Sequence, residues 1–134
     1  MTTPSPDTGD AAQSTALPYP AAFFKVANLP GFAPVAGVEM QIMTGQNVMV
    51  NWVTIEAGAA VPGHAHPHEQ LGFVLEGEIN MTIDGETRVL GPGDAYAIPG
   101  TVSHGASAGP NGCVVIDIFS PLRDDYVAAA KPRS

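Results

Sequence analysis

Basic residues are scarce in this sequence. Five Lys and Arg residues stand against thirteen Asp and Glu, which gives a net charge of -8. A protein that binds nucleic acid needs a basic face to displace counterions from the phosphates. Five basic side chains cannot make such a face, so we expect no nucleic acid partner. If the ligand is an anion, the attraction must be local, from a metal ion or a single Arg.

Cysteine and long apolar runs are lacking as well. The one cysteine, Cys113, excludes an internal disulfide, and its apolar surroundings predict a buried strand residue. No stretch approaches the roughly 20 apolar residues that span a bilayer. The N-terminus shows no basic segment followed by an apolar one, as a signal peptide would. We therefore expect a cytoplasmic protein that does not insert into membranes.

Glycine and proline, by contrast, are frequent, with 15 and 13 copies among 134 residues. They separate short apolar runs, a pattern that predicts many turns between short strands. Asp84-Gly85 is a strong two-residue hairpin signal. A short helix is expected at residues 124–130, which open with two acidic side chains. The predicted strands cover residues 38–43, 47–55, 61–66, 71–75, 78–83, 87–90, 96–98, 104–106 and 113–119.

The N-terminal region differs from the rest of the chain. Residues 1–20 are rich in Thr, Ser, Pro, Ala and Asp without periodicity, which predicts a flexible tail. Residues 21–134 are expected to form one domain, a β-sandwich or barrel, that starts with a strand or strap. The strap carries Phe23, Phe24 and Phe32, which suit the barrel surface or the interface of a homodimer.

Histidines cluster in the segment HAHPHEQ at residues 64–70. Side chains at positions i and i+2 of a strand share a face, so His64 and His66 can converge, and Gln70 has the same parity. His104 follows about 40 residues after the first of them. Three imidazoles and an amide oxygen suit a divalent first-row metal ion. The alternative is that these are surface or core residues that hold no ion.

Two motifs around these residues resemble those of the cupin family. Residues 58–77 have the spacing G-x5-H-x-H-x3-E-x6-G, and residues 93–108 have the spacing G-x5-P-x-G-x2-H-x3-N. Three positions depart from the motifs. Gln70 stands in place of the usual Glu ligand, and Thr101 and Ala108 stand in place of Gly and Asn. The resemblance implies an all-β protein, a single RmlC-like jelly-roll β-barrel with a short C-terminal helix.

The exchange of Glu for Gln at position 70 has a chemical consequence. With neutral donors only, the ion keeps its full double charge and polarises a bound carbonyl, hydroxyl or water more strongly. This favours Lewis-acid chemistry. The sequence does not choose among Zn, Ni, Fe, Co and Mn. His68 shares the parity of the other ligands and is a reserve ligand, although a place beside the site or at the barrel mouth is expected for it.

The last predicted strand places a carboxylate among apolar residues. Asp117 and Phe119 share one face of this strand, and Ile116 and Ile118 share the other. A buried Asp is costly unless it is paired, hydrogen-bonded or functional. The alternative is that Asp117 faces solvent on the outside of the sheet and that Arg123 is an ordinary surface charge.

Over residues 48–127 the chain resembles the KdgF-like pectin-degradation cupins. The resemblance is carried by HxHPHEQ, GDxYxIP, SHG and D-x-F-S-P-x-R-x-D-[FY]. It implies an enzyme that linearises the cyclic unsaturated uronates left by pectin and alginate lyases. The metal ligands that it implies are His64, His66, Gln70 and His104, and the residues implicated in the reaction are Asp117, Phe119 and Arg123.

The resemblance also implies a role for each of these residues. Arg123 would pair with the carboxylate of a small anionic sugar acid, and Asp117 would move a proton. Phe119 would form an apolar wall of the site against the sugar ring. Tyr96 and Gln41 are further candidates for the wall. Because small cupins host many activities, other readings stay open: another metal-dependent enzyme such as a dioxygenase or lyase, a non-catalytic sugar- or metabolite-binding module, or a metal-bound structural barrel.

Overall fold

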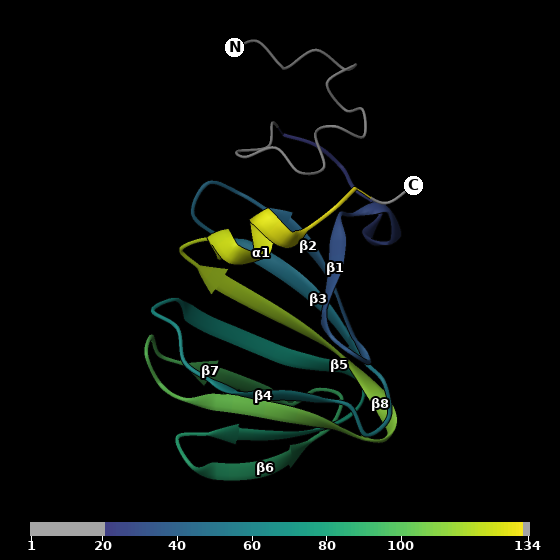
Figure 1. Cartoon of the computed structure of the whole chain (residues 1–134), viewed down its shortest axis with the longest axis vertical. Helices are drawn as coiled ribbons and strands as arrows, with labels where there is room; N and C mark the ends of the chain where they lie inside the picture. The colour runs from purple at the N-terminus through teal and green to yellow at the C-terminus, as the bar shows by residue number, and fades with distance from the viewer. Residues whose placement is uncertain (1–20, 133–134) are drawn as a thin grey trace.

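The structure is a computed structural model that describes residues 21–132. The tail expected at residues 1–20 lies outside the described residues. Within them the chain forms eight strands, a 3-10 turn at Val26–Asn28 and a short helix (Figure 1). The elements are β1 (Gly31–Val35), β2 (Val38–Thr44), β3 (Met49–Ile55), β4 (Ala60–His64), β5 (Glu69–Ile83), β6 (Glu86–Leu90), β7 (Ala95–Ile98), β8 (His104–Ser120) and α1 (Asp124–Ala129).

Every strand pair is antiparallel, and the order β1-β2-β3-β8-β5-β6 is completed by β4 on β8 and β7 on β5. The long strands β5 and β8 belong to both halves of the barrel. Residues 113–119 of β8 pair with β3, whereas its residues 104–107 pair with β4. The sheet therefore folds back on itself, as Figure 1 shows, and the predicted all-β barrel with a C-terminal helix is confirmed.

Both long strands correct the sequence prediction, which divided each of them in two. The turn expected near Glu76-Gly77 is instead an irregularity within β5, where the register against β8 shifts. Gly77 has φ of 73° and lies against the backbone of Gly112, so no side chain fits there. Bulges of this kind bend a strand without ending it, and the bend carries β5 and β8 from one half of the barrel to the other.

The core fills the space between the two halves of the sheet. In β2 and β3 buried residues alternate with more exposed ones, the period of two that the sequence predicts for half-buried strands. The predicted hairpin at Asp84-Gly85 is also confirmed, with φ of 49° and 83°. The core includes Val38, Met40, Val53, Ile55, Val74, Ile79, Met81 and Val115.

Apolar side chains also remain on the outside of β5. Leu71, Phe73 and Leu75 are between 40% and 48% exposed. Phe32, a candidate interface residue, instead packs its ring 5.2 Å from that of Tyr126 and so helps to hold α1 on the barrel. The homodimer stays a prediction. In the part of the chain that the structure describes, no helix has the length and apolar character to cross a membrane.

Candidate metal centre and adjoining cavity

Three histidines converge at one end of the barrel. His64 on β4 and His104 on β8 are directly opposite each other in the sheet, and their ring centroids are 4.4 Å apart. His66 follows two residues after the end of β4, with its ring centroid 4.8 Å from that of His104. One nitrogen from each ring lies within 4.8 Å of the others. The group is therefore positioned to bind a metal ion, as the sequence predicts.

The hydrogen bonds of the three rings fix which nitrogen is free. Each imidazole places Nδ1 2.9 to 3.1 Å from the carbonyl oxygen of a residue two positions away in the chain. Because a carbonyl oxygen can only accept, Nδ1 carries the proton and Nε2 keeps its lone pair. The Nε2 atom of His104 is buried without a hydrogen-bond partner. Metal-binding histidines are typically held in this way.

Burial keeps the rings of His66 and His104 neutral. Burial, together with the charges of Arg123 and the neighbouring histidines, lowers the pKa of His66 to about 4. Burial is also the main reason that the pKa of His104 is lowered. Neutral imidazole is the form that binds a metal ion, since a proton and the ion compete for the same lone pair. The site is therefore ready for a cation at neutral pH.

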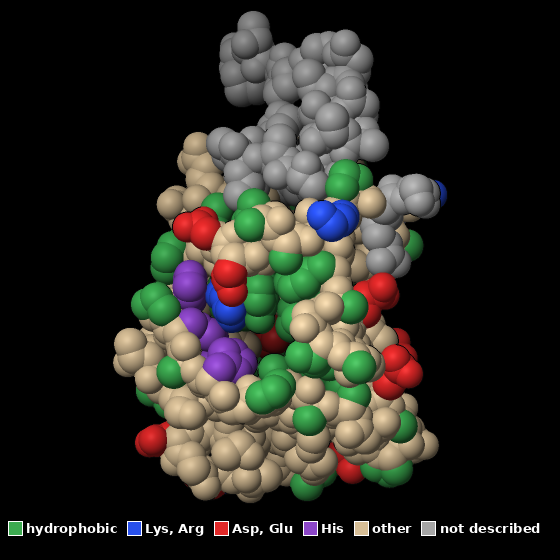
Figure 2. Space-filling model, viewed as in Figure 1, with side chains coloured by type: hydrophobic (Ala, Val, Ile, Leu, Met, Phe, Trp, Pro, Cys, Tyr) green, Lys and Arg blue, Asp and Glu red, His purple; other side chains and the backbone are tan. Residues whose placement is uncertain are grey.

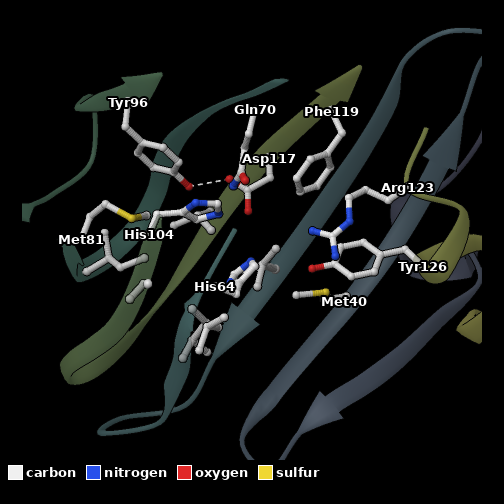
Figure 3. Close-up of a pocket in the computed structure, with 17 residues that line it drawn as sticks. Met40, His64, Gln70, Met81, Tyr96, His104, Asp117, Phe119, Arg123 and Tyr126 are labelled. Carbon is white, nitrogen blue, oxygen red and sulfur yellow. Dashed lines mark hydrogen bonds between the residues drawn. The ribbon is translucent and has the colours of Figure 1, made fainter. Parts of the chain in front are cut away.

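Gln70 joins the histidine group to a second cluster. Its side chain points inward from β5 and is buried, with Oε1 3.1 Å from Nε2 of His66. The same amide hydrogen-bonds the carboxyl group of Asp117. Figure 3 shows Gln70 and Asp117 side by side at the top of the cavity.

Asp117 faces the interior, so the alternative that it lies on the outer face is wrong. Tyr96 donates a hydrogen bond of 2.6 Å to its Oδ1 (Figure 3). Gly72 pairs with both residues in the sheet, and its missing side chain makes room for this bond, because a Cβ there would overlap the Tyr96 ring and the Asp117 carboxyl. Burial raises the pKa of Asp117 to about 6, although hydrogen bonds from Tyr96 and Gln70 and the charge of Arg123 oppose the rise.

Arg123 is buried as well, just before α1, so it is not the ordinary surface charge of the alternative reading. Its guanidinium lies 3.8 Å from the ring centroid of Tyr126 and 5.3 Å from that of Phe119. Asp125 accepts hydrogen bonds from Nε at 3.1 Å and Nη2 at 2.7 Å. Nη1 is buried without a partner.

One cavity connects these groups. Its enclosed volume is about 40 Å³, far below the ~300–1,000 Å³ of most ligand sites. A larger ligand would therefore also occupy the mouth, where Figure 2 shows histidines and charged side chains around a hollow. The residues with polar side chains that line the cavity are His64, Gln70, Tyr96, His104, Asp117, Arg123 and Tyr126.

The lining differs from the sequence prediction at several positions. Met40 and Tyr126 line the cavity but were not predicted, although Tyr126 belongs to the D-x-F-S-P-x-R-x-D-[FY] pattern. Gln41 was a candidate for the wall, but its amide donates to the carbonyl oxygen of Val26 instead. His68 is not among the converging histidines, and its carbonyl oxygen accepts the hydrogen bond from Nδ1 of His66.

Comparison with known proteins agrees with this geometry. Residues 51–119, about half of the chain, match the family model of the cupin domain. The chain is a cupin. It is 36% identical over 93 residues to the pectin degradation protein KdgF of Dickeya dadantii, an alignment that covers 68% of this chain and 84% of that protein.

Two solved structures resemble this cupin along most of their length. KdgF from Halomonas sp. has a TM-score of 0.73 and 34% identity, covering 78% of this chain and 97% of that one. An RmlC-like cupin from Shewanella frigidimarina has a TM-score of 0.70 and 34% identity, covering 77% and 92%. The fold is thus an RmlC-like cupin barrel.

Proposed function

We propose that this cupin is a metal-dependent enzyme that linearises 4,5-unsaturated uronate monosaccharides, the small anionic sugars released from pectin or alginate. The similarity to KdgF, a pectin degradation protein, supports this function. The observation that carries the proposal is one cavity in which a histidine group, a buried carboxyl and a buried guanidinium meet.

In this proposal Gln70 is the fourth ligand of one divalent transition metal ion, beside His64, His66 and His104. The contact between Gln70 and His66 supports the assignment. Their facing atoms are both acceptors, an amide oxygen and a bare Nε2, yet they lie 3.1 Å apart. Two lone pairs that face each other at this distance repel, and a cation bound by both atoms would remove that repulsion. A bound ion supplies Lewis-acid polarisation of the sugar oxygens.

Arg123 binds the substrate carboxylate. Its Nη1 group is a buried donor without a partner, and its side chain lines the cavity. A charge-assisted hydrogen bond to a carboxylate would satisfy this donor. Phe119 lines the cavity, with its ring centroid 5.6 Å from that of His66, and forms the wall against which the sugar ring lies.

Asp117 moves the proton. Linearisation removes a proton from the anomeric hydroxyl, breaks the bond between C1 and the ring oxygen, and delivers a proton to C4 as the enol becomes a ketone. No atoms are gained or lost overall. A carboxyl whose pKa is raised to about 6 can both accept and donate near neutral pH. Tyr96 and Gln70 hold the carboxyl group in place, and Asp117 lines the cavity in which the sugar would bind.

The test uses the metal-loaded protein and unsaturated galacturonate prepared with a pectin lyase. We expect the C4=C5 absorbance to disappear faster than in buffer, with NMR showing an open-chain keto acid. Chelated protein and the His104→Ala variant should both be inactive. A rate equal to that in buffer at full metal loading would refute the proposed function, and oxygen uptake during turnover would favour an oxygenase instead.

A further inference from the structure

We propose that Asp125 is a positioning residue that sets which edge of the Arg123 guanidinium faces the cavity, and so determines the specificity for a carboxylate. The inference deepens the proposed function and rests on it, because it takes the ligand of Arg123 to be the substrate carboxylate. Asp125 itself is exposed and does not line the cavity.

Asp125 occupies one edge of the guanidinium and leaves the other free. An arginine has five N–H donors, and Asp125 takes the pair offered by Nε and Nη2. The Nη1 donors and one hydrogen of Nη2 remain, and they offer the adjacent edge, formed by Nη1 and Nη2. Since Nη1 is buried without a partner, this edge is the one available for a second carboxylate. Buried donors are costly to leave unpaired, which favours an acceptor at this place.

The aromatic rings alone do not fix this orientation. Tyr126 and Phe119 lie close to the guanidinium and hold its plane by cation–π contacts. A flat cation that is stacked on a ring can still rotate within its own plane, and a single hydrogen bond between Tyr126 and Arg123 still leaves a pivot. Two hydrogen bonds to one carboxylate remove that freedom, because both N–H vectors must point at Asp125. The pair is also asymmetric, with side-chain exposures of 9% for Arg123 and 60% for Asp125, so Asp125 contacts it from the solvent side.

A purely structural role is the competing explanation. Asp124 and Asp125 both lie in the first turn of α1, where a negative charge favours the helix. In the ion pair between Arg123 and Asp125 the carboxylate is largely exposed to solvent, so we expect the pair to add little to the free energy of unfolding. Asp124→Asn is therefore the matched control, since it removes the same charge from the same turn and leaves the Arg123 pair intact.

The first test compares the kinetics of Asp125→Asn and Asp124→Asn on unsaturated galacturonate. An anchor that holds the ground state and the transition state equally affects KM and not kcat. We expect Asp125→Asn to raise KM about tenfold, as loss of a hydrogen bond to a charged group does, at nearly unchanged kcat. Asp124→Asn should stay within about twofold, the usual range for an exposed substitution. Equal effects of the two substitutions would overturn the proposal.

A double-mutant cycle asks whether Asp125 acts through Arg123. Arg123→Met keeps a long side chain between the two rings and removes every donor. In that background Asp125→Asn should have no further effect on KM, whereas independent effects would multiply. Independent effects would show that Asp125 acts elsewhere and would contradict the proposal.

A spectroscopic readout separates failure of this inference from failure of the proposed function. The Nε–H proton of Arg123 should give a slowly exchanging NMR signal in the wild type and in Asp124→Asn, and should be lost in Asp125→Asn. Persistence of the signal in Asp125→Asn would overturn the positioning role even if the enzyme is active. Wild-type protein that shows the signal but no turnover would overturn the proposed function, and with it the carboxylate as ligand of Arg123.

Discussion

Replacing Asp117 with asparagine should stabilise the metal-free protein at neutral pH while abolishing its activity. The carboxyl group is buried, and burial raises its pKa from 3.8 to about 6. Between these two values the folded protein keeps a proton that the unfolded chain has released. Stability contributed by this group therefore falls as the pH rises through that window and stays low above it. Asparagine has the same shape and has no charge to bury.

The size of the effect follows from the shift. A rise of roughly two pKa units at about 1.4 kcal/mol each gives close to 3 kcal/mol. Because a small part of this is already lost at pH 4, the advantage of Asp117→Asn over wild type should grow by about 2.4 kcal/mol between pH 4 and pH 8. The lowered pKa values of His66 and His104 act in the opposite direction, but they are present in both proteins and cancel in the comparison.

The assay is urea unfolding, followed through the single tryptophan, Trp52, with a chelator present at every pH. A bound dication beside Asp117 would favour the carboxylate and hide the effect. Asp124→Asn, at an exposed carboxyl, is the control for the loss of one negative charge. A difference between Asp117→Asn and wild type that does not change from pH 4 to pH 8 would refute the reasoning.

Three further predictions test the neighbouring contacts. His104→Ala should lower the metal affinity measured by calorimetry more than about 100-fold. Removing only a residue that hydrogen-bonds a metal ligand already costs up to about 100-fold, and His104 is proposed as a ligand itself. Unchanged affinity would place the ion elsewhere. Gly72→Ala should cost about 1–3 kcal/mol in urea unfolding through overlap with Tyr96 and Asp117, whereas Gly91→Ala, which meets nothing within 4 Å, should cost far less. Tyr96→Phe removes a donor to the ionised carboxyl, so its stability cost of about 1–3 kcal/mol should appear at pH 8 and shrink at pH 4; an equal cost at both would contradict the contact.

Local sequence patterns were enough to predict most strands. The strands predicted at residues 38–43 and 47–55 are found at Val38–Thr44 and Met49–Ile55, and Asp84-Gly85 adopts the positive φ values of a tight hairpin. The continuity of β5 and β8 could not be predicted in this way. A glycine in an apolar segment is typical of both a turn and a bulge, and the pairing with distant strands decides between them.

The candidate site was predicted unevenly for a related reason. Strand parity was enough to predict that His64 and His66 converge, although β4 ends before His66. His104 was predicted through its place in the second cupin motif, and the structure brings it to the other two. The bond between Tyr96 and Asp117 was not predicted, because it depends on cross-strand register and on the empty space at a glycine. The proposed role of Asp125 likewise depends on the orientation of the Arg123 guanidinium, which the spacing of residues in the sequence does not specify.

The central claim is that three imidazoles, with Gln70 beside them, hold one divalent transition metal ion. The most direct measurement is the metal content of protein that has been stripped with a chelator and titrated with Zn, Ni, Fe, Co or Mn ions. We predict saturation at one ion per chain in the wild type and none in a variant that lacks both His64 and His104. Stripped wild-type protein that takes up none of these ions, or a double variant that binds them equally well, would contradict the account.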